Sequence, residues 1–188
     1  MTRSLTIPWP NHLITLEEWE ALPDDGVRLE LVEGVIAVSP QPFPWHQFAC
    51  HNLARLANDR LPRSLITLGE IEVVVAEPPL TIRIPDLVVT RTARYEANPP
   101  RLAATDVLLA VEVLSDGTRR VDRVLKFAEY AEARIPQYWI LDLDEPTSLL
   151  TYVLVDDSYE LSGEHTGTTM LDVAGHPVEI DLPALIRR

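Results

Sequence analysis

A nearly continuous apolar run, DVLLAVEVLS at residues 106–115, constrains the fold more than any other feature of this chain. Such a run is typical of a central strand that is buried on both faces of its sheet. One carboxylate, Glu112, lies inside the run. Burying a carboxylate costs several kcal/mol unless it is paired or neutralised, so this residue requires a partner. The partner could be an arginine or a neighbouring backbone group, or it could be a metal ion.

A second apolar run, TIRIPDLVVT at residues 81–90, carries another carboxylate, Asp86. Pro85 lies directly before it and has no N–H to donate, which predicts an edge strand or a bulge at this point. Two carboxylates with several retained waters are the usual way in which a protein holds Mg²⁺. We therefore expect Asp86 and Glu112 to bind one Mg²⁺ ion, with Mn²⁺ as the alternative.

A helix is predicted from about Arg119 to Ala133, because turn residues precede it and a proline follows it. Asp122, Lys126 and Tyr130 are spaced four residues apart and share one face of this helix. That face could simply be a solvated stripe with an ordinary ion pair. The helix begins only a few residues after Glu112, however, so Lys126 can reach a metal bound there. Such a lysine would orient or help to deprotonate the attacking water and would stabilise charge on a phosphate.

Three other residues are weaker candidates for the same site. Glu30 lies in a predicted strand and Glu33 next to the turn of a hairpin, and either could bring a third carboxylate to the metal. Glu33 could equally be a solvated turn residue. His46 begins a predicted helix, where a lone histidine is more often a cap or a packed surface residue. Cys50 is the single cysteine, and we expect it to be a small core residue rather than part of a cysteine-based zinc site.

The charge of the chain argues against broad, non-specific binding to nucleic acid. Lys plus Arg number 16 and Asp plus Glu number 29, so the formal charge is 16 − 29 = −13. Non-specific binding requires a positive surface. A nuclease is still allowed, because a divalent cation offsets the acids that bind it. Three arginines at the start of the predicted helix could contact phosphates, but a solvated basic face is the simpler interpretation; they are Arg119, Arg120 and Arg123.

The length of 188 residues suits one domain over residues 1–188, with 1–14 as a lead-in segment. No apolar run approaches the roughly 18–20 residues that cross a bilayer, so we expect no membrane partner. The first residues have no apolar segment of signal-peptide length, and a cytoplasmic location is the default expectation.

Apolar spacing and turn residues predict the remaining elements. Their order indicates an α/β or α+β fold with a mixed central sheet flanked by helices and a C-terminal β meander. Helices are expected at about 16–22, 45–61 and 182–188, a hairpin at 27–40, and strands within 64–77, 137–143, 148–155, 158–163 and 168–173, with turns at Asp156-Asp157 and Gly163.

These segments resemble the Uma-two family of bacterial restriction-endonuclease-like proteins over nearly the whole chain, from about Leu16 to Leu185. The resemblance is carried by LELVEGVIAVSP with the following His46, by IPDLVVT, and by the long segment from LLAVEVLSDGT to PQYWILD. That family is similar to the PD-(D/E)xK phosphodiesterases. The resemblance implies a restriction-endonuclease-like fold.

The resemblance also implies roles for individual residues. Pro85-Asp86 corresponds to the PD element and Glu112 to the acid of (D/E)xK. The position two after Glu112 is Leu114 rather than lysine, and Lys126 on the following helix is the implied substitute. Glu30 and Asp122 match assisting acids of the family pattern, and Tyr130 a supporting residue.

Two functions follow as expectations. The first is a Mg²⁺-dependent endodeoxyribonuclease, a hydrolase that cuts phosphodiester bonds in DNA. The second is a non-catalytic module that binds nucleic acid or protein on a nuclease fold, which the acidic charge favours. A homodimer is plausible for either.

Overall fold

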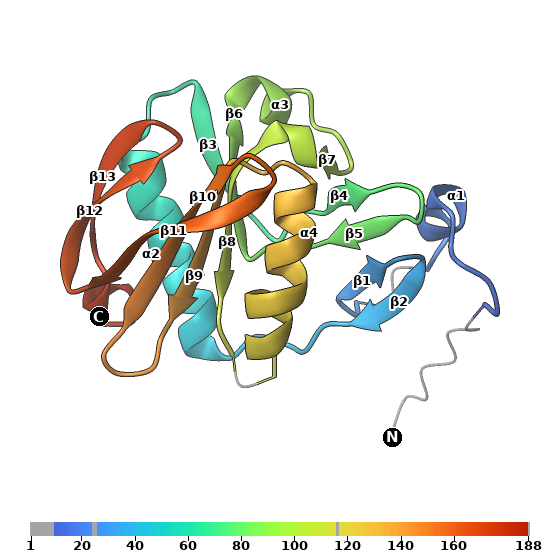
Figure 1. Cartoon of the computed structure of the whole chain (residues 1–188), viewed down its shortest axis with the longest axis horizontal. Helices are drawn as coiled ribbons and strands as arrows, with labels where there is room; N and C mark the ends of the chain where they lie inside the picture. Colours follow the sequence, from blue (N-terminus) through green and yellow to red (C-terminus); the bar gives the residue numbers. More distant parts are fainter. Residues whose placement is uncertain (1–9, 24–25, 116, 188) are drawn as a thin grey trace.

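The computed structural model of the chain describes residues 10–23, 26–115 and 117–187 (Figure 1). Its largest sheet has the order β11-β10-β9-β8-β6-β3. Strand β8 pairs parallel with β9, whereas the other neighbours are antiparallel, so the sheet is mixed. The strands are β3 (Leu65–Gly69), β6 (Leu87–Arg91), β8 (Val107–Val113), β9 (Gln137–Asp142), β10 (Ser148–Val155) and β11 (Ser158–Thr166).

A five-stranded sheet and a two-stranded hairpin complete the β structure of the described residues. The five-stranded sheet has the order β2-β1-β5-β4-β7 and the hairpin pairs β12 with β13. The strands are β1 (Leu29–Val32), β2 (Val35–Val38), β4 (Val73–Ala76), β5 (Thr81–Arg83), β7 (Leu102–Ala103), β12 (Thr168–Val173) and β13 (His176–Asp181).

Helices cover both faces of the six-stranded sheet, with α2 behind it and α4 in front of it in Figure 1. The predicted mixed sheet with flanking helices and a C-terminal meander is thereby confirmed. The helices are α1 (Leu16–Glu20), α2 (Pro44–Arg60), α3 (Thr92–Glu96), α4 (Phe127–Glu132), the π-helix η2 (Val121–Lys126) and the 3₁₀ turns η1 (Ala104–Asp106) and η3 (Pro183–Leu185).

The alternation of strand β8 decides which helix each of its side chains meets. Leu109, Val111 and Val113 pack in the cluster that contains α2, whereas Ala110 packs in the cluster that contains α4. Successive side chains of a strand point to opposite faces, so Glu112 falls on the α4 side.

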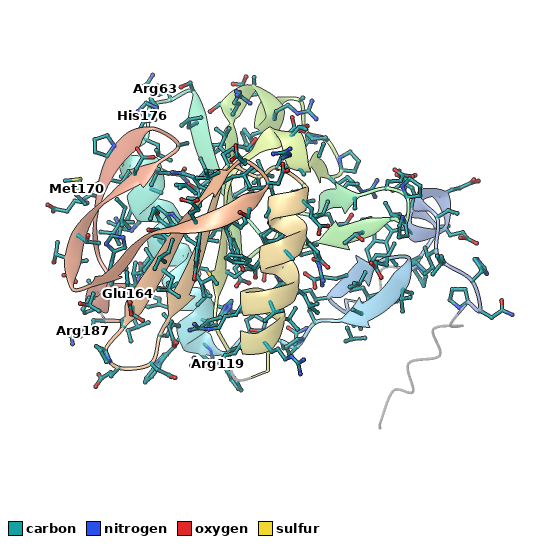
Figure 2. All side chains as sticks on the ribbon, viewed as in Figure 1. Arg63, Arg119, Glu164, Met170, His176 and Arg187 are labelled. Carbon is teal, nitrogen blue, oxygen red and sulfur yellow. The ribbon has the colours of Figure 1, made fainter. Side chains whose placement is uncertain are left out.

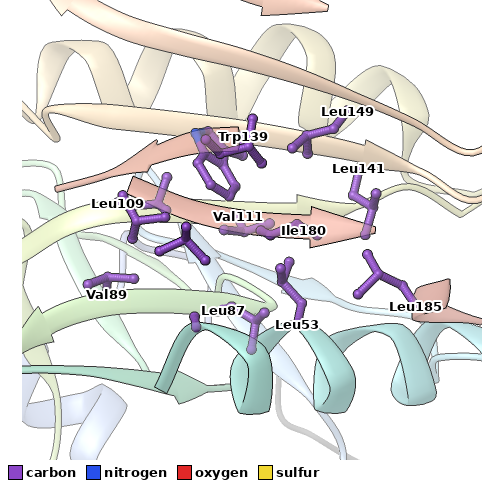
Figure 3. Packing of buried hydrophobic residues seen from close by; sticks show 14 of the residues in the cluster. Leu53, Leu87, Val89, Leu109, Val111, Trp139, Leu141, Leu149, Ile180 and Leu185 are labelled. Carbon is purple, nitrogen blue, oxygen red and sulfur yellow. The ribbon is translucent and has the colours of Figure 1, made fainter. Parts of the chain in front are cut away.

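The cluster on the α2 side forms the larger part of the core (Figure 3). Leu53 of α2 packs there with Trp139 of β9, and Ile180 of the β12–β13 hairpin closes it. The hairpin is therefore part of the core rather than an appendage.

The segment around Pro85 differs from the prediction. The chain leaves the five-stranded sheet after β5 and enters the six-stranded sheet at β6, so Pro85-Asp86 is the passage between two sheets. Strand β6 lies between β8 and β3, and the predicted edge strand is wrong. Proline fits the passage because neither ladder needs its missing N–H there.

The C-terminal meander also differs in detail. Gly163, predicted as a turn, lies inside β11, where the register against β10 shifts at Thr151/Tyr152. Strand β13 was not predicted, although Val178 and Ile180 alternate with exposed residues along it. The predicted terminal helix is reduced to the single turn η3, and residue 188 lies outside the described residues.

The predicted lead-in is only partly described, because residues 1–9 lie outside the described ranges. Its last residue is buried: Ile14 donates its N–H to the Gly34 carbonyl at 2.8 Å. The predicted helix α1 then begins at a capping box of Thr15 and Glu18.

Candidate active site

Two buried carboxylates meet where strand β6 begins and strand β8 ends. Leu87 pairs with Val111 in the antiparallel ladder, and extending that register by one residue places Asp86 beside Glu112. The Val113 N–H donates to Asp86 Oδ2 at 2.8 Å. Asp86 is 6% and Glu112 2% exposed. The antiparallel pairing thus brings together two acids that lie 26 positions apart in the sequence, since 112 − 86 = 26.

The ammonium group of Lys126 faces three carboxylates, of which Glu112 is one. Lys126 Nζ lies 2.9 Å from Glu112 Oε1, 3.4 Å from Glu30 Oε1 and 3.7 Å from Asp122 Oδ1. The Tyr130 hydroxyl donates to the same Glu112 oxygen at 2.8 Å. The predicted helical face of Asp122, Lys126 and Tyr130 therefore points into the molecule and is not a solvated stripe.

The first part of this helix, η2, is a π-helix rather than an α-helix. π-Turns are rare and are found frequently at functional sites. Asp122 lies in η2 at 1% exposure, and its Oδ1 has no hydrogen-bond partner in the described part of the chain. Leaving a buried polar group unsatisfied costs about 1–3 kcal/mol, and more if it is charged. A bound water or cation would remove that cost.

Glu30 is held in place by a buried arginine that we did not predict. Arg83 Nη1 donates to Glu30 Oε2 at 3.0 Å, and the Ile84 N–H donates to Glu30 Oε1 at 2.9 Å. The same guanidinium makes two bonds of 2.7 Å to Glu129. The sequence feature that could have revealed Arg83 is its place in the mostly apolar run TIRIPDLVVT. A cation that is buried there requires a carboxylate partner.

Asp86 has two further partners. His46 Nε2 lies 3.1 Å from Asp86 Oδ2, and Arg28 Nη2 lies 3.4 Å from Asp86 Oδ1. His46 is buried, so the prediction of a cap or surface histidine is wrong. Arg28 was not predicted, and it also donates to the Ile84 carbonyl at 2.7 Å.

Cys50 lies one helical turn after His46, with Sγ 3.7 Å from His46 Nδ1. His46, Cys50 and Asp86 present possible metal-ligand atoms that all lie within 4.8 Å of one another. The half-buried thiol packs against the α2-side core cluster, as expected, and it also contacts the His46 ring. Burial, followed by the charges of Asp86 and Glu112, raises the pKa of the thiol far above its ordinary value, which disfavours a thiolate ligand.

Opposing effects set the charges in the cluster. Burial raises the pKa of Glu112 well above its ordinary value despite Lys126, and the negative charges of Asp86 and Asp122 add to the increase. Burial also raises the pKa of Asp122. Burial alone would lower the pKa of Lys126, but Glu112, Glu30 and Asp122 more than offset it and raise it. Lys126 is therefore protonated at neutral pH.

At Glu30 and Asp86 the neighbouring groups outweigh burial, so the pKa of each carboxyl is lowered. Burial alone would raise the pKa of Glu30, but Lys126, the Ile84 N–H and Arg83 more than offset this and lower it. Burial likewise would raise the pKa of Asp86, and the hydrogen bond and charge of His46 bring it below its ordinary value. Both groups are ionised at neutral pH.

A cavity of about 40 Å³ opens onto the cluster. Asp86, Glu112, Asp122 and Lys126 line it, and the proline-containing loop at residues 39–42 forms another side. A water needs about 10–15 Å³ when volume is measured this way, so the cavity accommodates an ion with a water or two.

Glu33 is the one predicted candidate that the structure keeps apart. It is exposed on the hairpin turn at φ +49°, and its N–H donates to Thr81 Oγ1 at 3.1 Å. No contact between described residues joins its side chain to the cluster. The alternative of a solvated turn residue fits this position.

Two comparisons with known proteins give matches. A model of the Uma2 family, described as "Putative restriction endonuclease", matches residues 16–184. A similar solved structure is "a putative nuclease belonging to DUF820 from Anabaena variabilis ATCC 29413", at 19% identity and a TM-score of 0.69. That match covers 92% of this chain and 97% of the other, and it shows a shared fold. No curated protein matches the chain.

Proposed function

This chain belongs to the Uma2 family, and on that premise we propose that it is a divalent-metal-dependent nuclease that hydrolyses phosphodiester bonds in DNA. The observation that supports this proposal most is the convergence of Glu112, Glu30 and Asp122 around the single ammonium of Lys126, with Asp86 lining the same cavity. DNA as the substrate, a cytoplasmic location and a homodimer are predictions made from the sequence.

The donor set fits a hard divalent cation such as Mg²⁺ or Mn²⁺. Asp86 and Glu112 would hold the ion through carboxylate oxygens, and waters would complete its shell. Asp122 Oδ1 accepts no hydrogen bond from the described residues and lies 3.7 Å from Lys126 Nζ, so an ion bound in the cavity would satisfy it. A bound divalent ion lowers the pKa of a water and polarises a phosphoryl oxygen.

Lys126 acts in this proposal as a fixed positive charge. Because it stays protonated at neutral pH, it cannot accept a proton from the attacking water. It can orient that water and stabilise negative charge that develops on the phosphate. Glu30 Oε1 lies 3.4 Å from Lys126 Nζ and positions the ammonium, and Arg83 in turn holds the Glu30 carboxylate. Asp122, whose Oδ1 accepts no hydrogen bond from the described residues and whose pKa burial raises, would take the proton from the attacking water.

The test is metal-dependent nicking of supercoiled plasmid DNA. Glu112→Gln and Lys126→Met are expected to lower the nicking rate roughly a hundredfold to a thousandfold, as removal of one electrostatic group from a transition state does. Glu33→Gln serves as the matched control, because this exposed acid lies outside the cluster. Nicking at the wild-type rate by both Glu112→Gln and Lys126→Met would reject the proposal.

The second candidate is a non-catalytic module that binds nucleic acid or protein on a nuclease fold. The net charge of −13 and the engagement of Lys126 with three carboxylates favour it. Calorimetric titration with Mn²⁺ separates the two: no metal binding, or metal binding that Asp86→Asn leaves unchanged, supports the module, whereas binding that Asp86→Asn abolishes supports the nuclease.

A further inference from the structure

We propose that a hollow beside the candidate active site binds an unpaired nucleobase, so that the nuclease acts on single-stranded or locally unpaired DNA. The inference rests on the proposed function and names its substrate class. The hollow has a volume of about 400 Å³. We call it the aromatic pocket; its walls include Phe43, Trp45, Leu114, Leu143, Arg119 and Asp144.

Two large aromatic side chains are presented to solvent at this pocket. Phe43 is 70% and Trp45 67% exposed. Pro44 lies between them at the first position of α2, and Pro42 precedes them. Proline restricts the backbone that carries these rings, so less backbone entropy is lost on binding. Exposed aromatic rings are the platforms on which single-stranded nucleic acids stack their bases.

The pocket adjoins the cavity that contains the carboxylates and Lys126. His46 and Ser115 line both hollows. A base is joined to its phosphate through one sugar, so a base next to the scissile phosphate can reach only an adjacent hollow. The shared wall satisfies this condition.

The charges of the pocket favour a neutral ligand over a phosphate. Arg119 makes bonds of 2.7 and 3.1 Å to Asp142 and pairs with Asp144 as well. Figure 2 shows Arg119 near the start of the η2–α4 helix. Two carboxylates beside one guanidinium would repel an anion, whereas a base edge offers both donors and acceptors to such a pair.

A second copy of the chain is the competing occupant. A stable interface buries about 1,200–2,000 Å² in total, and two rings with a charged rim supply little of it. A fully paired duplex fits poorly too, because its bases are stacked and cannot enter a side pocket without being extruded.

The experiment measures binding of fluorescein-labelled oligonucleotides by anisotropy, with Ca²⁺ in place of Mg²⁺. Trp45→Ala is expected to weaken binding of a single-stranded 12-mer roughly fivefold to 150-fold, the range that loss of one stacked base corresponds to. Trp45→Phe should restore most of the affinity. Met170→Ala is the control, since this exposed residue lies on β12, away from the η2–α4 helix (Figure 2). The wild-type protein should bind the duplex more weakly than the single strand.

Equal single-strand affinity of Trp45→Ala and wild type, or tighter binding of the duplex, would overturn the inference. A wild-type dimer that Trp45→Ala converts to a monomer would also overturn it, because the partner copy would then fill the pocket. Nicking that depends on Lys126 but not on Trp45 leaves the proposed function standing without this pocket. Binding that depends on Trp45, in a protein that nicks nothing, supports the pocket and rejects the nuclease.

Discussion

At the scale of single residues, the site depends on carboxylates whose surroundings push them in opposite directions. Burial dominates at Glu112 and raises its pKa, whereas the partners of Asp86 lower its pKa. Groups with such different environments can share one cavity and still have different protonation states, which is how paired acids divide their roles. The ion pair of His46 and Asp86 makes the stabilisation of the ionised Asp86 measurable, because it makes the stability of the protein depend on pH.

We predict that His46→Gln destabilises the metal-free protein more at pH 5 than at pH 9. Burial alone would lower the pKa of His46, but the hydrogen bond and charge of Asp86 more than offset it and raise the pKa. The contribution of the protonated ring is complete below about pH 6.5 and is lost as the pH rises through the folded-state pKa. The contribution of Asp86 is complete above about pH 3.9 and is lost on acidification. At pH 5 both are present, and we expect a loss of about 1.5–3 kcal/mol.

Urea denaturation in EDTA at the two pH values measures this difference. His51→Gln is the matched control, because His51 lies on the same helix and is exposed. A loss of stability by His46→Gln that is equal at pH 5 and pH 9 would show that the pair contributes no charge interaction.

At the scale of secondary-structure elements, η2 is what aims Asp122 and Lys126 at the cavity. The Tyr138 hydroxyl of β9 donates to the Asp122 carbonyl in η2 at 2.9 Å. We predict that Tyr138→Phe lowers the free energy of unfolding by about 0.5–1.5 kcal/mol and also weakens Mn²⁺ binding. Tyr159→Phe is the control: its hydroxyl donates to the Ile135 carbonyl at 2.8 Å, outside η2.

Unfolding in urea measures the free energy of unfolding, and calorimetric titration measures the affinity for Mn²⁺. The two variants should lose similar stability, and only Tyr138→Phe should lose metal affinity. Equal Mn²⁺ affinity in both variants would mean that η2 keeps its shape without this bond.

The elements also show which features the sequence could predict. Asp86 and Glu112 were conspicuous because desolvation makes an acid in an apolar strand costly, and Lys126 followed from helical spacing. Arg83 and Arg28 were missed because their partners come from other strands, and no local pattern encodes such pairing.

Two elements of secondary structure were also not predicted, each for its own reason. The π-helix η2 spans only 6 residues, too few for a change in apolar periodicity to show in the sequence. Strand β13 was missed because Pro177 weakens its strand pattern, although Val178 and Ile180 alternate correctly with exposed residues.

At the scale of the whole molecule, the site and the main core lie on different sides of the six-stranded sheet. Glu112 and Lys126 lie on the α4 side, whereas the β12–β13 hairpin packs on the α2 side. Gln137 of β9 fastens that hairpin by bonding to Asp172 at 2.9 Å and accepting the Ala174 N–H at 2.8 Å. Stability and metal binding should therefore respond separately to changes in the hairpin.

We predict that Ile180→Ala lowers the free energy of unfolding by about 2–5 kcal/mol and leaves the Mn²⁺ affinity of the folded protein unchanged. Ile180 is fully buried among Leu53, Trp139 and the rest of the α2-side cluster, so truncation leaves a cavity there. Met170→Ala on the same hairpin is exposed and should change neither quantity. A fall in Mn²⁺ affinity that matches the loss of stability would show that the sheet transmits core packing to the carboxylates. In that case the two sides of β8 form one cooperative unit, and variants elsewhere in the core could not be used to separate folding from function.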